Sequence, residues 1–356
     1  MLDYKSNLTI VFFIVFFLFI IVIDKENESI SNDHLLIKSV FAIPPDQDLI
    51  VLSSWELNTT NIKDIALDFT GNIYFTEYAT NKIKRLTPST NTITEWNIPA
   101  ENSGPYSIDF DAISGNIYFT EYATNKIGRL IPSTNTITEW NIPTENSGPT
   151  NLISDGSSSS IYFIEEKTNK IGKLDFTSSK FSEYQLNSNS TLTGGFIDIT
   201  YDGNLKQLYY VLNDTLTIGR LDTSTNTTTE WNIPSQNSNS TAPKEITSLS
   251  NVYGDIFFAK SDSNKIGRLT PSTNTITEWN IPAENSGPTD LVFDFGTSVY
   301  FLENKTDKIG RYNFIQNVFT EWDISKSPYL VAANSVGDIF FVDKEKIARI
   351  SWNANL

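Results

Sequence analysis

The chain has 356 residues, of which 39% are hydrophobic and 13% aromatic, enough apolar material for a large core. A formal net charge of −16 repels phosphate backbones, so nucleic acid is not an expected partner. Cysteine is absent, and the single histidine, His34, precedes the repeats described below. Disulfides, thiolate chemistry and imidazole chemistry within the repeats are therefore excluded.

The N-terminal region is dominated by the apolar run LTIVFFIVFFLFIIVI at residues 8–23. As a helix this run would span about 24 Å, between a signal-peptide core and a membrane anchor. Lys5 precedes it and acidic residues follow it, which favours export of the rest of the chain. We predict a cytoplasmic N-terminus at residues 1–7, a single-pass transmembrane signal anchor at 8–23 and a stalk at 24–48.

The remainder is then expected on the extracytoplasmic side of the cell membrane. Secretion after signal cleavage is the alternative, because a cleavage-like Val40-Phe41-Ala42 follows the apolar run.

From residue 49 onward the chain consists of internal repeats. Residues 71–105 recur at 115–149 with three differences, Lys84/Gly128, Thr87/Ile131 and Ala100/Thr144. Elements like KIGRL and TEWNI each occur seven times along the chain. Repetition of this length, without helical periodicity, is typical of a propeller.

Each repeat contains four strand-like runs. In the first repeat they cover residues 62–69, 72–78, 82–87 and 92–98, separated by turn signals such as Gly71-Asn72 and Pro88-Ser-Thr-Asn91. The last repeat stops without a fourth run, while residues 49–57 form a fourth run without the other three. We predict an all-β, seven-bladed β-propeller over residues 49–356, with four antiparallel strands per blade and a ring closed by the N-terminal strand. The repeated Trp is interpreted as inter-blade packing, with sugar stacking as the alternative.

Candidate functional residues lie where second strands end and innermost strands begin, because both reach the same face around the channel. We expect the carboxylates at second-strand ends to be ligands for Mg²⁺ or Ca²⁺, which prefer oxygen: Glu77, Glu121, Glu165, Glu303 and Asp343. A glutamate present in most repeats is alternatively part of the framework, paired with Lys or Arg of the KIGRL element. Positions that break the repeat or begin innermost strands are candidate ligand-binding residues: Lys63, Tyr106, Lys244, Lys260, Thr289 and Tyr329.

The repeats, with IYFTE, NKIGRL, ITEW and GP at this spacing, resemble those of the streptogramin (virginiamycin B) lyase family over residues 49–356. The resemblance implies a seven-bladed propeller. It also implies elimination that opens a cyclic depsipeptide, using Mg²⁺, top-face glutamates and histidines that follow the Pro of an innermost strand. Glu303 stands at a top-face glutamate position and Asp343 near another, whereas Thr289 and Tyr329 follow Pro288 and Pro328 in place of histidine.

These features favour a membrane-anchored binding or interaction module over an enzyme. Its acidic top face would recognise a small molecule, a peptide or a component of the cell envelope, together with a divalent cation. The first alternative is a Mg²⁺-dependent carbon–oxygen lyase or lactone-cleaving enzyme, with Glu303, Asp343 and Tyr329 as catalytic candidates. The second is a structural protein of the envelope.

Overall fold

The computed structural model describes the propeller in detail and a short N-terminal hairpin by its backbone. The described residues are 9–14, 17–22, 50–57, 59, 61–157, 159–186, 196–203, 205–212, 216–234, 249–250, 254–324, 328–334, 337–343 and 346–351. The chain divides into two compact units, Met1–Pro44 and Pro45–Leu356.

In the first unit, β1 (Thr9–Ile14) and β2 (Phe17–Val22) pair as an antiparallel hairpin. Among the described residues there is no helix of the length and hydropathy needed to cross a membrane. The expected cytoplasmic N-terminus and stalk lie outside the described residues.

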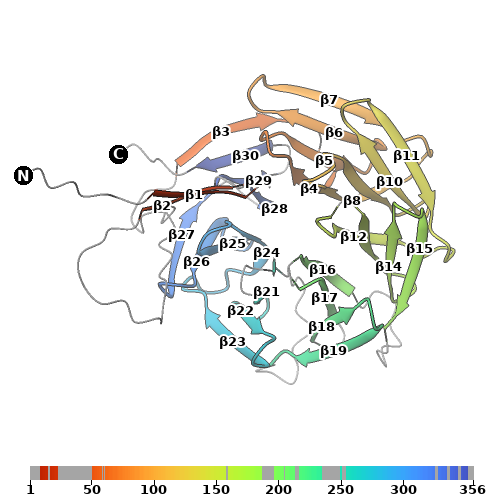
Figure 1. Ribbon diagram of the computed structural model, residues 1–356. Coiled ribbons are helices and arrows are strands. Elements are labelled where there is room, and N and C mark those ends of the chain that lie inside the picture. The colour runs from red at the N-terminus through yellow and green to blue at the C-terminus, as the bar shows by residue number, and fades with distance from the viewer. Residues whose placement is uncertain are drawn as a thin grey trace, which may run out of the picture. The chain divides into compact units, whose positions relative to one another are not determined.

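The second unit is built from seven four-stranded antiparallel sheets, the blades, arranged radially around a centre (Figure 1). Blade 1 contains β4 (Ile62–Leu67), β5 (Ile73–Glu77), β6 (Lys82–Thr87) and β7 (Thr92–Asn97). Blade 2 contains β8 (Pro105–Phe110), β9 (Ile117–Glu121), β10 (Lys126–Ile131) and β11 (Thr136–Asn141). Blade 3 contains β12 (Pro149–Ser154), β13 (Ser160–Glu165), β14 (Lys170–Asp175) and β15 (Lys180–Gln185).

The remaining blades follow in the same order around the ring. Blade 4 contains β16 (Phe196–Asp202), β17 (Gln207–Leu212), β18 (Thr217–Asp222) and β19 (Thr227–Asn232). Blade 5 contains β20 (Leu249–Ser250), β21 (Ile256–Lys260), β22 (Lys265–Thr270) and β23 (Thr275–Asn280). Blade 6 contains β24 (Pro288–Phe293), β25 (Ser298–Glu303), β26 (Lys308–Asn313) and β27 (Val318–Asp323). Blade 7 contains β28 (Pro328–Ala333), β29 (Ile339–Asp343), β30 (Lys346–Ser351) and β3 (Ile50–Glu56).

Blade 7 confirms the predicted closure of the ring. Its outer strand β3 comes from the start of the propeller and pairs antiparallel with β30, with Trp55 opposite Ile347. The first strand of blade 7 contacts the first strand of blade 1, so the ring is continuous. The strands of blade 1 begin and end within two residues of their predicted limits.

Packing between blades explains why the second strands are the most apolar. In β5 and β9 all five residues of IYFTE are buried, because they lie between two neighbouring sheets. The fourth strands alternate instead, since one of their faces meets solvent. One core cluster joins Trp55 and Ile347 of blade 7 to Ile62 and Phe75 of blade 1, so the seam of the ring is packed like the other junctions.

The strand register defines two faces of the ring. First strands begin opposite the ends of second strands, as in the pairs Pro105–Glu121, Pro149–Glu165, Pro288–Glu303 and Pro328–Asp343. We call the face with these residues the upper face. The face where first strands end and second strands begin is called the lower face.

Candidate functional site

Carboxylates stand at the upper end of the second strand in five blades, at the predicted positions Glu77, Glu121, Glu165, Glu303 and Asp343. All four glutamates are buried, with no more than 2% of any of them exposed. One oxygen of each accepts a hydrogen bond from a threonine three residues later, at 2.9 Å from Thr124 to Glu121 and 3.1 Å from Thr306 to Glu303. The structure therefore buries these carboxyl groups at the upper ends of their second strands.

A second glutamate, on the fourth strand of each of these blades, shares the same sheet face. In blade 2 it is Glu139, which pairs across the strands with Gly128, while Gly128 in turn pairs with Phe119 on the strand of Glu121. The lysine of the KIGRL element binds this second glutamate, with Lys126 Nζ 2.9 Å from Glu139 Oε2. In these blades the lysine of the KIGRL element therefore pairs with the glutamate of the fourth strand and not with the glutamate of the second strand.

The result is a second-strand glutamate that is buried next to another carboxylate. Burial, and then the neighbouring fourth-strand glutamate, raise the pKa of Glu121, Glu165 and Glu303 to about 7. In each of the three, Oε1 is buried and has no hydrogen-bond partner in the described part of the chain.

Blade 1 differs because a lysine replaces the glycine. Lys84 Nζ lies 2.9 Å from both Glu77 Oε2 and Glu95 Oε1. Although burial opposes the change, hydrogen bonds from Thr59, Thr80 and Lys84 lower the pKa of Glu77. Our sequence interpretation missed this role, although Lys84/Gly128 is one of only three differences between the first two repeats.

Blade 5 places a lysine at the second-strand end itself. Lys260 is 6% exposed, and its Nζ lies 2.5 Å from Glu278 Oε1 and 2.6 Å from the Pro234 carbonyl oxygen. This predicted ligand-binding residue therefore forms a buried framework ion pair.

The other predicted ligand-binding residues lie in different surroundings. Lys63 is exposed, with Nζ 5.5 Å from the ring centre of Tyr78. Tyr106 is half-buried, and its ring centre lies 6.0 Å from that of Tyr122. Lys244 lies outside the described residues.

Blades 6 and 7 bring four of the predicted residues to one part of the upper face. The Val331 backbone N–H donates to Asp290 Oδ2 at 2.6 Å, which joins the first strands β24 and β28. Thr289 directly precedes Asp290 in the sequence, and Tyr329 lies two residues before Val331. Glu303 and Asp343 end the second strands paired with β24 and β28.

The four side chains share one property, which Glu121 and Glu165 also have. Each has a buried oxygen without a hydrogen-bond partner among the described residues, namely Thr289 Oγ1, Glu303 Oε1, Tyr329 Oη and Asp343 Oδ1. Orphaned buried polar atoms cost free energy, so a group of them marks a candidate site for a ligand or solvent. Burial, and then Asp343, raise the pKa of Tyr329 to about 12, so this phenol stays protonated at neutral pH. We call these four residues the blade 6–7 cluster.

The blade 6–7 cluster contains two carboxylates, Glu303 and Asp343. No group of three or more His, Asp or Glu side chains arranged to hold a metal ion occurs within the described ranges. Mg²⁺ is often bound by one or two carboxylates, with water molecules as its remaining ligands. Glu303 and Asp343 fit Mg²⁺ only in this arrangement, in which water supplies most of the ligands.

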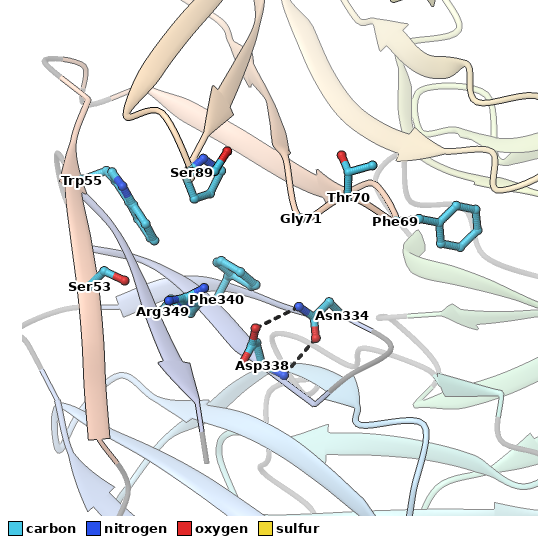
Figure 2. A pocket seen from close by; sticks show the side chains of 11 residues that line it. Ser53, Trp55, Phe69, Thr70, Gly71, Ser89, Asn334, Asp338, Phe340 and Arg349 are labelled. Atoms are coloured by element: carbon cyan, nitrogen blue, oxygen red, sulfur yellow. Dashed lines mark hydrogen bonds between the residues drawn. The ribbon is translucent and has the colours of Figure 1, made fainter. Parts of the chain in front are cut away.

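A cavity of about 500 Å³ lies at the lower face, at the seam between blades 7 and 1. Figure 2 shows Trp55, Phe340 and Arg349 on one side of it and Phe69 on the other. Asp338 and Asn334 hydrogen-bond to each other at its wall, at 2.9 and 3.1 Å. The cavity is separate from the blade 6–7 cluster, which occupies the opposite face.

Comparison with known proteins finds one matching family model, described as the Virginiamycin B lyase family, over residues 56–350. Virginiamycin B lyase from Staphylococcus aureus, in selenomethionine form, is 28% identical, with a TM-score of 0.73 over 86% of this chain and 100% of that one. A streptogramin B lyase structure is 28% identical, with a TM-score of 0.73 over 85% and 97%.

A catalytically inactive histidine-to-alanine variant of the Staphylococcus aureus enzyme, with quinupristin, is also similar. It is 26% identical, with a TM-score of 0.74 over 86% of this chain and 100% of that chain. No curated protein sequence matches.

Proposed function

Since this chain belongs to the virginiamycin B lyase family, we propose that its propeller is a binding module whose ligand site is the blade 6–7 cluster. The four orphaned buried oxygens of that cluster carry this proposal. A ligand that offers hydrogen-bond donors or positive charge would satisfy them, because hydroxyl oxygens can accept hydrogen bonds and carboxylate oxygens can only accept them. The expected ligand is an amine-bearing small molecule, peptide or envelope component, or a hydrated divalent cation.

Binding without lyase activity is supported by the missing histidines. The related enzyme is inactive when one histidine is replaced by alanine. In this chain Thr289 and Tyr329 follow Pro288 and Pro328, and the one histidine, His34, precedes the propeller. Neither a threonine hydroxyl nor a tyrosine with a raised pKa accepts a proton near neutral pH.

Our proposal includes an anchor at residues 8–23 that holds the propeller at the extracytoplasmic side of the cell membrane. Sixteen consecutive residues without a charge support it. Inside a bilayer an isolated hairpin such as β1–β2 leaves edge backbone groups unsatisfied, so we expect this segment to be helical there. Protease protection of the propeller on intact cells, with digestion only after the membrane is opened, would contradict this orientation.

Titration calorimetry of the full chain with Mg²⁺, Ca²⁺ and 1,4-diaminobutane tests the site. We expect binding by the wild type and at least a tenfold weaker affinity for Glu303→Gln and Asp343→Asn. Glu121→Gln is the matched control, because Glu121 occupies the same strand position in blade 2. No binding of any probe by the wild type, or an equal loss in the control, would contradict the proposal.

A carbon–oxygen lyase that uses a carboxylate base is the second candidate. The raised pKa of Glu303, about 7, favours it, because a general base works best near the pH of the reaction. Quinupristin and Mg²⁺ incubated with the protein would then yield a linear product of unchanged mass, seen by mass spectrometry. We expect no turnover, and turnover that Glu303→Gln abolishes would replace the binding proposal.

A further inference from the structure

The two faces of the propeller differ in the side chains that they expose. Four large hydrophobic residues are exposed at turns between first and second strands, and therefore at the lower face. They are Phe69, Ile113, Leu205 and Phe295, with 55–60% of each side chain accessible. The other three in the described residues are Ile93, Ile315 and Val318, which lie in or next to turns between third and fourth strands, also at the lower face.

Exposed charge is sparse in the turns between first and second strands, although Lys180 is exposed beside a turn between third and fourth strands of the same face. In the described turns between first and second strands, Lys206 is the one exposed charged residue. The aspartates of these turns instead bind their own loops, as Asp68 does with Thr70 and Asn72. The loops of the upper face expose charges such as Glu101, Glu145 and Glu284.

The polypeptide also enters the propeller at the lower face. Ile50, the first residue of β3, pairs with Ser351, the last residue of β30. The 26 residues 24–49 connect this point to the apolar segment at residues 8–23. Even fully extended, 26 residues reach at most about 90 Å, so the covalent connection limits the distance between this point of entry and that segment.

We propose that the lower face docks on the surface of the membrane that holds residues 8–23, with the exposed hydrophobic side chains in the headgroup region. This inference rests on the anchor in the proposed function. Scattered aromatic and aliphatic side chains suit the interface between headgroups and acyl chains, where Phe and Leu of interfacial proteins lie. The charged upper face, with the blade 6–7 cluster, then points away from the membrane toward soluble ligands.

The absence of cysteine makes a direct test possible, since each introduced cysteine is the sole thiol. Ser114→Cys at the lower face and Glu145→Cys at the upper face, both exposed, are labelled with an environment-sensitive fluorophore in the full chain. The chains are reconstituted in phosphatidylcholine vesicles that contain lipids spin-labelled near the headgroup. We expect a blue shift and at least twofold stronger quenching at Ser114→Cys than at Glu145→Cys.

Adding Phe69→Ser and Phe295→Ser to the Ser114→Cys chain should abolish the difference in fluorescence between the lower-face and upper-face labels. This chain should still float with the vesicles, which shows that it remains bound to them. Equal signals from both faces in a chain that floats would overturn the docking and leave the anchor intact. Failure to float would overturn the anchor and the docking together. A blue shift at Ser114→Cys that grows with the ratio of protein to lipid would show that the lower face binds a second copy of the chain. That result would overturn the membrane contact.

Discussion

One glutamate position of the repeat exists in two electrostatic states. Glu165 has an orphaned oxygen and a pKa near 7, whereas Glu77 binds Lys84 and has a lowered pKa. The backbone and the strand position are the same in both blades. Lysine in place of glycine opposite the aromatic ring is one difference between the two blades, and the hydrogen bond from Thr59 to Glu77 is another.

Because of the raised pKa values, the free energy of unfolding should decrease as pH rises. Acidic groups with a lowered pKa have the opposite effect. In the folded state the pKa values of Glu121, Glu165 and Glu303 lie above the ordinary glutamate value of 4.5. Between pH 4.5 and 7 the folded state holds protons that the unfolded state has released, so stability falls as pH rises through this window. The shift to about 7 corresponds to at most about 3 kcal/mol per group.

We expect Glu165→Gln to stabilise the protein by about 1–3 kcal/mol at pH 8 and to change little at pH 4.5, since an amide carries no charge to bury. Glu77→Gln is the matched comparison and should destabilise at pH 8, because it removes an ion-pair partner of buried Lys84. Urea unfolding at the two pH values measures both. The same sign of change for the two variants at pH 8 would refute the assignment.

At the scale of the element, side chains on turns fasten each blade to the next. Trp231 Nε1 donates to Asn274 Oδ1 of the following blade at 3.0 Å, and Trp96 makes the same bond to Asn135. Asn274 has a φ of 54°, a left-handed conformation that asparagine tolerates better than most residues. The repeated Trp thus joins blades by a hydrogen bond as well as by packing.

A double-mutant cycle on Trp231 and Asn274 isolates this bond. We expect Trp231→Phe and Asn274→Gly each to lower the free energy of unfolding by about 1–2 kcal/mol, with an interaction energy of about 1 kcal/mol. Glycine is chosen because it accepts the positive φ without strain. Additive effects in urea unfolding would show that the bond contributes nothing to stability.

A second feature of the elements is the glycine opposite the aromatic ring of the second strand. A Cβ on Gly172 would lie 2.1 Å from Phe163 Cζ, far below a van der Waals contact. We expect Gly172→Ala to destabilise by about 1–3 kcal/mol or more, because the buried ring has to move. Gly203→Ala is the control, since a Cβ there meets nothing within 4 Å. Equal melting temperatures for the two variants would contradict this account.

At the scale of the whole molecule, stability depends on the closure of blade 7. Deleting residues 49–57 removes β3, leaves the edge of β30 unpaired and takes Trp55 and Leu57 out of the core at the seam. We expect a loss of at least about 3–5 kcal/mol, the typical cost of one buried Trp. Thermal unfolding measures this loss, and an unchanged melting temperature would argue against closure as a source of stability.

Glu56→Gln is the control for the deletion. It breaks only the ion pair with Lys346, in which the two side chains are 62% and 46% exposed. An exposed pair of this kind contributes less than about 1 kcal/mol, so the melting temperature should hardly change.

The sequence by itself determined the strands, the seven blades and the closure. Three properties of the sequence predicted them: alternation of apolar and polar residues within a strand, turn residues such as Gly71 and Asn91, and the repeat length. None of these properties depends on which residues are neighbours in the folded structure. The last repeat lacks a fourth strand, and residues 49–57 form a fourth strand without the other three. Together they predicted one complete blade. The sequence also placed Glu303 and Asp343 at the same face as Thr289 and Tyr329, since strand direction alternates regularly in a blade.

Only the tertiary structure decided which charges compensate one another and which side chains reach solvent. Lys260 binds Glu278, Lys84 bridges two glutamates, and Glu303 keeps an orphaned oxygen, although all three blades share one repeat. Burial also separated the charged upper face from a lower face with exposed hydrophobic side chains. These properties depend on distances of a few ångströms between strands and blades, and a linear pattern of residue types does not contain them.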